Sequence, residues 1–198
     1  MIIPEELAKD GNIVYKVSVE PLIEPISLDD LKLFARIDGD TEDALLQSLI
    51  TSARSFAENY LNRSLIEQTL IAKMDFWPCE AVALPRSPLI SITSVQTLDE
   101  DDTATTYSSD NYYLDLYSEP GKIILKNGVS APTNTDRTYG GFKITYKAGY
   151  GAAASNVPKP IRDGIKQWAM NMYENRAIAE EPPFEVKTML DLYKVHRV

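Results

Sequence analysis

The stretch Thr145-Tyr-Lys-Ala-Gly-Tyr-Gly151 marks the point where this chain changes from one kind of secondary structure to another. Its alternating residues favour a β-strand, and the two glycines favour a turn in which the backbone takes positive φ. The segment Val157-Pro-Lys-Pro-Ile161 follows. Proline is well tolerated in the first turn of a helix, so Pro158 or Pro160 predicts a helix start. The order strand, glycine turn, helix is therefore expected here.

The helix predicted after these prolines has a strong apolar stripe and ends near Tyr173-Glu-Asn-Arg176. A stripe of three- and four-residue spacing predicts an amphipathic helix that covers a core. The residues of the stripe are Ile161, Ile165, Trp168, Ala169, Met172 and Tyr173.

Two more helices are predicted near the N-terminus. Ser27-Leu-Asp-Asp30 offers a capping serine with acids in the first turn, where carboxylates complement the helix dipole. After the turn Asp38-Gly39-Asp40, Thr41 is expected to cap a longer helix. Its apolar positions form one broad stripe, which predicts a buried face. They are Leu45, Leu46, Leu49, Ile50, Ala53, Phe56, Ala57, Tyr60 and Leu61.

Between these helical parts, residues 65–150 have short alternating runs separated by turn-forming residues. Such spacing favours an antiparallel barrel or sandwich. The sequence therefore predicts an α+β fold, in which the N- and C-terminal parts form a helical core and an antiparallel β lobe is inserted. The expected strands are 67–76, 81–84, 90–98, 112–116, 122–125 and 142–146.

The expected organisation has five parts. Residues 1–26 read as an extended arm, with a period of two around Ile13 to Glu20 and three prolines. Residues 27–64 and 157–178 form the helical core, and residues 65–150 form the inserted lobe. Beyond the break at Glu180-Glu-Pro-Pro183, residues 184–198 form a short helix and a basic tail.

The chain of 198 residues is acidic, with a formal net charge of −9. Proteins that hold nucleic acid cluster Lys and Arg, and here the basic residues are scattered along the sequence, so sequence-independent DNA binding is not expected. An acidic surface is compatible with a conduit that DNA passes without adhering. The sequence also predicts neither a signal peptide nor a membrane span.

The N-terminal helix pair, its Asp-rich turn, the ending Asn62-Arg63-Ser64-Leu65, and the segment from Tyr146 to Arg176 together resemble one family. It is the head–tail connector (adaptor, head-completion) family of tailed double-stranded DNA phages, in its longer branch with a β-rich segment. The resemblance runs from about Ile26 to Tyr193. The N-terminal arm and the long β segment depart from the shorter members.

The resemblance implies a structural adaptor and no enzyme. It implies a ring of this chain, commonly twelve copies, below the portal protein of the virion. The ring would extend the DNA channel, through which DNA passes without specific binding, and would link the capsid to a tail-proximal stopper or tail protein. The protein would be made in the cytoplasm of the bacterial host and would reside at the head–tail interface.

In the family the C-terminal segment docks on the portal, which assigns that contact to residues 186–198. The residues agree with an amphipathic helix that enters a partner groove, because their apolar anchors recur at i, i+3, i+4 and i+7 and a basic end follows. The same face could instead pack on the chain's own core. The proposed contact residues are Val186, Met189, Leu190, Tyr193, Lys194, His196 and Arg197.

The sequence predicts no catalytic, cofactor or metal site. Cys79 and His196 are single residues of their type and remote in sequence. The acidic run 99–102 lacks the Gly and Glu of a calcium loop, since Ala104 and Asp110 stand there, and it predicts a hairpin turn. Gly149-Tyr-Gly151 lacks the third glycine of a dinucleotide-binding loop.

Two alternatives from other classes stay open. One is a small carboxylate-dependent enzyme using Asp110, Asp115 or Asp136, which would need paired acids in a pocket. The other is a nucleic-acid-binding module on the β lobe, with tyrosines that stack on bases but no basic groove. Those tyrosines are Tyr107, Tyr112, Tyr113, Tyr117, Tyr139 and Tyr146.

Overall fold

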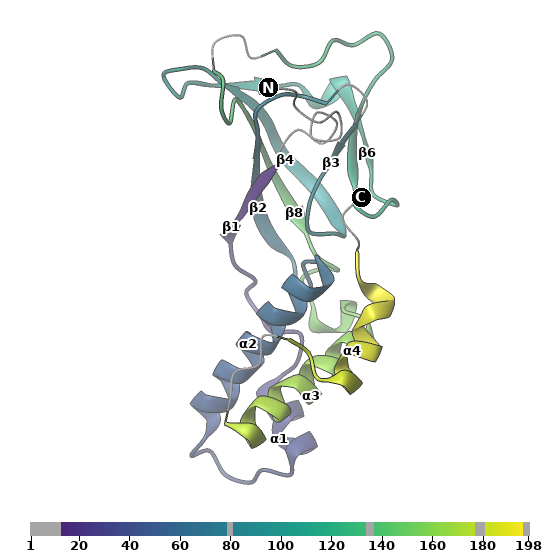
Figure 1. The fold of residues 1–198 in the computed structure, drawn as a ribbon. Helices are drawn as coiled ribbons and strands as arrows, with labels where there is room; N and C mark the ends of the chain where they lie inside the picture. The colour runs from purple at the N-terminus through teal and green to yellow at the C-terminus, as the bar shows by residue number, and fades with distance from the viewer. Residues whose placement is uncertain (1–12, 79–80, 134–136, 177–180, 196–198) are drawn as a thin grey trace, which may run out of the picture. The chain divides into compact units, whose positions relative to one another are not determined.

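The computed structural model describes residues 13–78, 81–133, 137–176 and 181–195 (Figure 1). The chain divides into two compact units. The β unit comprises residues 1–20 and 68–148, and the helical unit comprises residues 21–67 and 149–198. Along these described ranges, none of the helices has the length and apolar character that crossing a membrane requires.

The helical unit contains the helices that the apolar stripes predict. They are α1 (Leu28–Ala35), α2 (Asp43–Leu61), α3 (Lys159–Asn175) and α4 (Phe184–Leu190), with 3₁₀ turns at Ala154–Asn156 and Asp191–Tyr193.

The starts of the first two helices differ from each other. Ser27 caps α1 as predicted, because its side chain accepts a hydrogen bond of 3.0 Å from the Asp30 backbone N–H. Thr41 does not cap α2, which begins at Asp43 without a side-chain cap. The turn before α2 is held instead by Lys32, whose ammonium lies 2.8 Å from a carboxylate oxygen of Asp40 and of Asp43.

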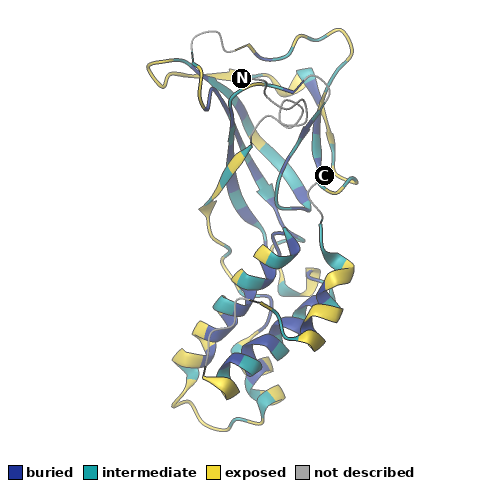
Figure 2. Cartoon of the chain, in the orientation of Figure 1, coloured by how far each residue is buried: buried dark blue, intermediate teal, exposed yellow. Residues whose placement is uncertain are grey.

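Helices α2 and α3 pack on each other and form the core of the helical unit, as Figure 2 shows by the buried residues along both. Trp168 is fully buried, and its ring lies 5.9 Å from that of Phe56. Leu45 was expected in this core and is 49% exposed. The next residue, Leu46, is fully buried, and one step along a helix turns the side chain by about 100°, which places Leu45 beyond the edge of the buried face.

A buried ion network ties the segment before α1 to α2. The Arg54 guanidinium donates to Glu24 at 2.8 Å and to Glu58 at 3.0 Å. Glu58 also accepts a 2.8 Å hydrogen bond from the Leu65 backbone N–H, where the chain leaves the helical unit. Because buried charges need partners, this network fixes the local geometry of both segments.

The β unit consists of two antiparallel sheets. A five-stranded sheet has the order β1-β2-β8-β4-β5, and a three-stranded sheet has the order β3-β7-β6. The strands are β1 (Val14–Val19), β2 (Gln68–Met74), β3 (Ala81–Ala83), β4 (Leu89–Leu98), β5 (Ala104–Tyr107), β6 (Tyr112–Asp115), β7 (Lys122–Leu125) and β8 (Phe142–Ala148).

Two of these strands qualify the sequence-based expectations. β1, within the segment expected to be an arm, pairs with β2 as an edge strand of the five-stranded sheet. β5 was not predicted, because Ala104-Thr-Thr-Tyr107 is short and has no apolar alternation. It forms by pairing with β4 across the turn that begins at Asp99, whose carboxylate accepts the backbone N–H of Thr103 at 2.7 Å.

The inner faces of both sheets share one core, so the predicted β lobe is a sandwich. Tyr146 of β8 is fully buried, and its hydroxyl donates to the Pro85 carbonyl at 2.9 Å. Burial raises the pKa of Tyr146. Alternate residues of β2 and β8 are buried, which leaves the intervening side chains on the outer face.

The return of the chain from β8 to the helical unit depends on glycine, as predicted. Gly149 has φ +134°, and a Cβ there would lie 2.6 Å from the Ile66 carbonyl oxygen. Tyr150 donates a 3.0 Å backbone hydrogen bond to Leu65, so the two chain crossings run side by side. A larger residue at position 149 would strain its own backbone, and its side chain would collide with the backbone of Ile66.

Candidate functional site

The C-terminal segment was predicted to carry a partner contact, and the structure divides its residues into two groups. Val186 and Leu190 of α4 are fully buried in the core of the helical unit. Gly164 of α3 permits this packing, since a Cβ there would lie 3.3 Å from Leu190 Cδ2. These two residues therefore follow the interpretation in which this face packs on the chain's own core.

The residues after α4 are tied to the C-terminal end of α2. The Val195 N–H donates to the Leu61 carbonyl at 2.9 Å, and the Asn62 side chain donates to the Val195 carbonyl at 2.9 Å. The Tyr60 hydroxyl donates to Asp191, and the Lys194 ammonium lies 4.0 Å from the centre of the Tyr60 ring. Burial, together with the Asp191 carboxylate, raises the pKa of Tyr60 to about 12.

The exposed part of this segment is a row that sequence reasoning missed. Phe184 is 79% exposed and Leu192 is 85% exposed, and with Thr188 they recur at a four-residue spacing. We call Phe184, Thr188 and Leu192 the C-terminal stripe. The spacing i, i+4, i+8 was present in the sequence, but the predicted contact followed the larger apolar set Val186, Met189, Leu190 and Tyr193 instead.

The remaining predicted contact residues flank the stripe or lie beyond the described structure. Met189, Tyr193 and Lys194 are half-buried beside it. His196 and Arg197 lie outside the described residues, as does Cys79.

A second surface lies on the N-terminal helices. Leu33 is 81% exposed and Phe34 is 55% exposed, both on α1, and half-exposed Leu45 lies in the first turn of α2. Large apolar side chains left in water on adjacent elements are typical of interaction surfaces. We call Leu33, Phe34 and Leu45 the α1 surface.

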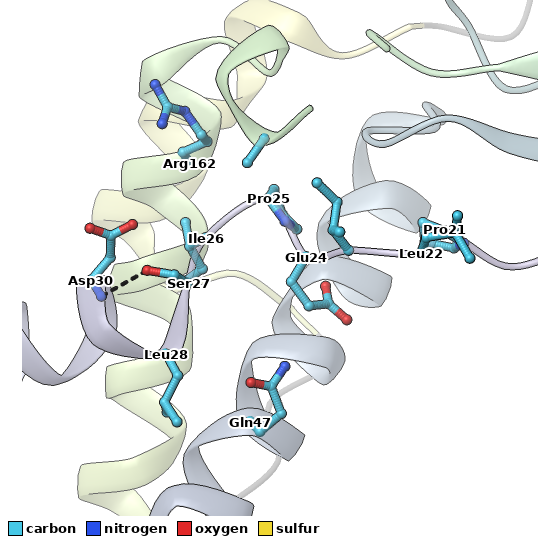
Figure 3. Close-up of a pocket in the computed structure, with 12 residues that line it drawn as sticks. Pro21, Leu22, Glu24, Pro25, Ile26, Ser27, Leu28, Asp30, Gln47 and Arg162 are labelled. Carbon is cyan, nitrogen blue, oxygen red and sulfur yellow. Dashed lines mark hydrogen bonds between the residues drawn. The ribbon is translucent and has the colours of Figure 1, made fainter. Parts of the chain in front are cut away.

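A shallow groove of about 520 Å³ runs along the segment before α1 (Figure 3). Side chains from three helices reach it, among them Asp30 of α1, Gln47 of α2 and Arg162 of α3. The Arg162 Nε donates to the Val157 carbonyl at 3.1 Å. Polar groups in its lining are engaged by other parts of the chain, such as Glu24 by Arg54 and Ser27 by the Asp30 backbone N–H.

The carboxylates considered for an enzyme do not form a pair in the described structure. Asp110 is exposed beside Ser108. Hydrogen bonds from Ser118, together with the Tyr117 backbone N–H, lower the pKa of Asp115, which is opposite to what a general acid needs. Asp136 lies outside the described residues. Within the described ranges, His, Cys, Asp and Glu side chains do not gather in groups of three suited to a metal ion.

The tyrosines considered for base stacking do not share one surface. Tyr112 and Tyr146 are buried in the core of the β unit. Tyr107 stacks on Tyr112 with 6.4 Å between ring centres. Tyr113, Tyr117 and Tyr139 remain exposed. Base stacking needs an accessible row of rings, so the buried members of this set do not contribute to the stacking platform that the alternative requires.

The described helices thus carry two exposed apolar surfaces, the C-terminal stripe and the α1 surface, which are typical of interaction sites. A family model described as a phage gp6-like head-tail connector protein matches residues 25–111. This match confirms the predicted resemblance to the head–tail connector family. None of the curated proteins matches the chain significantly.

Three solved structures share the fold. A chain in the neck of an empty gene transfer agent particle, computed with C6 symmetry, is 20% identical with a TM-score of 0.80, covering 93% of this chain and 97% of its own. A chain of the native gene transfer agent virion is 21% identical with a TM-score of 0.77, covering 93% and 97%. A chain of the native neck, computed with C12 symmetry, is 21% identical with a TM-score of 0.71, covering 91% and 96%.

Proposed function

We propose that this chain is a structural head–tail adaptor in the neck of a phage-like particle, without catalytic activity of its own. The observation that carries the proposal is the family match over residues 25–111, which includes α1 and α2. The fold supports it, since more than nine tenths of the chain aligns with chains in the necks of gene transfer agent particles.

The adaptor acts as a homo-oligomeric ring, for which twelve copies are proposed. Neck structures of this fold were computed with C6 and C12 symmetry, and both are compatible with twelve subunits. A ring needs a heterologous contact, in which one surface meets a different surface of the next copy. The α1 surface provides exposed apolar area for such a contact.

The C-terminal segment makes the contact with the portal. Its buried face is occupied by its own core, so the exposed C-terminal stripe carries the apolar part of the contact. Tyr193 and Lys194 flank the stripe, and the basic residues His196 and Arg197, which lie outside the described residues, are proposed to meet acidic groups on the portal. The opposite side of the ring binds the next tail-proximal protein, and DNA passes through the centre.

The portal contact is tested with the double substitution Phe184→Ser and Leu192→Ser. Both side chains are exposed, so the variant should keep its circular dichroism spectrum and thermal midpoint. Its incorporation into portal-containing heads, measured by co-sedimentation and negative-stain microscopy, should fall at least about tenfold, as expected for exposed interface anchors.

A matched control replaces two exposed side chains of the β unit, Tyr117→Ser and Tyr139→Ser. This control should assemble like the unchanged protein. A folded stripe variant that assembles normally would show that the portal contact lies elsewhere on the chain.

A further inference from the structure

The β unit exposes large apolar side chains along β6, the hairpin that follows it, and β7. Tyr113 of β6 is 61% exposed, and Tyr117 of the hairpin is 98% exposed. The strand register places Tyr113 opposite Ile124 of β7, and Ile124 opposite Ala81 of β3. Residues paired in this way point to the same side, so an apolar row crosses the outer face of the three-stranded sheet. We call Tyr113, Leu114, Leu116, Tyr117 and Ile124 the β6 surface.

The backbone of β6 has one side that no strand of the described structure occupies. Strand β6 pairs with β7 and is an outer strand of the three-stranded sheet (Figure 1). The Asn111 carbonyl accepts a 3.0 Å hydrogen bond from the Lys126 N–H, which fixes the residues that bond to β7. Because bonding alternates along an antiparallel pair, the N–H and C=O groups of Tyr112 and Leu114 point away from β7. These groups form an edge on which a further strand can bond.

The other outer strands of the two sheets are less suited to accept a partner strand. Strand β1 carries Lys16, and its pairing with β2 is irregular between Val17 and Val19. Strand β3 has three residues, and β5 exposes threonines rather than large apolar side chains. A lysine, an irregular register and a short strand are features with which proteins protect sheet edges. Strand β6 is also short, but exposed apolar side chains lie on both of its faces, at Tyr113 and Leu114.

The hairpin after β6 is fixed at both of its ends. The Asp115 carboxylate accepts hydrogen bonds of 3.0 Å from the backbone N–H groups of Tyr117 and Ser118. At the other end, Gly121 lies so close to β4 that a Cβ there would be 2.5 Å from the Leu89 Cβ. An aromatic side chain on a fixed loop loses little conformational entropy when it binds, and such side chains are typical anchors of protein interfaces.

The charged side chains between Asp115 and the end of β7 are engaged within the chain. Asp115 lies opposite Lys122, which acts on it electrostatically. The Lys126 ammonium, just after β7, lies 5.1 Å from the centre of the Tyr113 ring, and Glu119 also has a partner in the chain. An uncharged apolar segment therefore complements the β6 surface better than an acidic or basic segment does.

We propose that the β6 surface binds an extended segment of the tail-proximal protein, which adds a strand to β6. The backbone of that segment bonds to the outward groups of Tyr112 and Leu114, and its alternate apolar side chains pack beside Tyr113. Tyr117 extends the contact beyond the strand. The inference rests on the proposed function, which assigns the portal and ring contacts to the helical unit and assigns no surface to the tail side.

Symmetry and size favour this partner over a second copy of the chain. Pairing of β6 with β6 of another copy would use the same surface twice, which closes a two-fold pair and cannot extend a ring. The β6 surface has few side chains, whereas a stable interface between two proteins uses roughly 20–30 residues a side. One copy therefore binds weakly, and a ring binds firmly because many copies engage the same partner assembly.

The experiment separates entry into heads from joining to tails. Portal-containing heads that carry rings of each variant are mixed with purified tails that bear the tail-proximal protein. Entry is measured by co-sedimentation of the variant with heads, and joining is measured by counting joined particles in negative-stain images. Each variant is first compared with the unchanged protein by circular dichroism and thermal unfolding.

The side-chain variant is Tyr113→Ser and Tyr117→Ser. Both side chains are exposed, so the variant should fold and enter heads normally. Its joining to tails should fall at least about tenfold, as expected when exposed aromatic anchors are removed. The matched control, Phe76→Ser and Tyr139→Ser, removes two other exposed aromatic side chains of the β unit and should join tails normally.

A second pair of variants tests the added strand itself. Leu114→Pro removes the N–H that points away from β7, and an edge strand tolerates proline at such a position. Leu114→Thr changes the same side chain but keeps this N–H. Joining should be at least about fivefold lower with proline than with threonine, because each added strand loses a hydrogen bond. Equal joining by two folded variants would contradict strand addition, and if proline unfolds the chain, the tyrosine variant decides.

Other outcomes would overturn the inference as a whole. Normal joining by the folded tyrosine variant would show that the β6 surface does not bind the tail side. Failure of this folded variant to enter heads would assign the surface to the ring or the portal. A dimer of the free chain that the same substitutions abolish, in sedimentation equilibrium, would assign it to a second copy. Failure of the unchanged chain to enter heads would instead contradict the adaptor function, whatever the variants do.

Discussion

The helical unit and the β unit differ in how their cationic side chains are placed. In the helical unit, Lys32 meets two aspartates, Arg54 meets two glutamates, and Lys159 and Lys166 share Asp163. On the five-stranded sheet of the β unit, lysine faces lysine. The helical unit thus pairs these cations with carboxylates, whereas Lys73 and Lys143 lie opposite each other on the sheet.

The largest expected effect tests the core of the helical unit. Trp168→Ala should lower the free energy of unfolding by about 3–5 kcal/mol, because it removes buried area and leaves a cavity between α2 and α3. Urea unfolding followed by circular dichroism measures the change. In this variant Trp77, in the β unit, remains as the fluorescent reporter. A loss below about 1 kcal/mol would contradict the central position of Trp168.

The next effect tests the buried ion network around Arg54. Arg54→Met should cost about 3 kcal/mol of unfolding free energy, because Glu24 and Glu58 then lose their buried cation. The control is Lys159→Met in the exposed pair with Asp163, which should change stability by less than about 0.5 kcal/mol. Chemical denaturation of both variants gives the comparison. Equal losses of unfolding free energy in the two variants would contradict a larger stabilising role for the buried network than for the exposed pair.

The smallest effect tests the repulsion between the opposed lysines of the sheet, and here the substitution is expected to raise the stability. Lys73→Gln should stabilise the free protein by about 0.2–1 kcal/mol at low salt, because it removes the repulsion from Lys143. The gain should vanish near 1 M salt, where charges are screened within about 3 Å. Thermal unfolding at both salt concentrations measures it.

The control for this prediction is Lys16→Gln, because Lys16 pairs with Ile71 and has no lysine opposite. It should leave stability unchanged. In the Lys73→Gln background, adding Lys143→Gln should give little further gain, because the repulsion is already gone. Destabilisation by Lys73→Gln would show that this lysine has a favourable partner within the chain.

The fold was largely predictable because its main signals are local. The apolar stripes of α2 and α3 extend over several helical turns. Because a helix repeats about every 3.6 residues, the residues of each stripe lie on one face, which is buried. The strands were predicted where alternating residues lie between turn-forming residues. The Thr41 cap was wrongly predicted, since Lys32 of α1 holds the turn before α2 instead. β5 was not predicted, because this edge strand depends on its pairing with β4.

The candidate contact surfaces were predictable only in part. The spacing of Val186 and Leu190 correctly indicated an amphipathic helix, yet it could not say whether a partner or the chain's own α3 covers that face. The burial of Val186 and Leu190 shows that the chain itself covers this face. Phe184 and Leu192 are the exposed apolar residues that remain available for a partner.

The sequence by itself determined the fold class, the two helical stripes, the glycine turn at Gly149 and the resemblance to head–tail connectors, because each depends on residues that are close along the chain. Only the tertiary structure decided where the lysines meet. Lys16, Lys73 and Lys143 are scattered over more than half of the sequence, and strand pairing brings them to one face. The register of a sheet is a relation between distant segments, so no local pattern could have shown it.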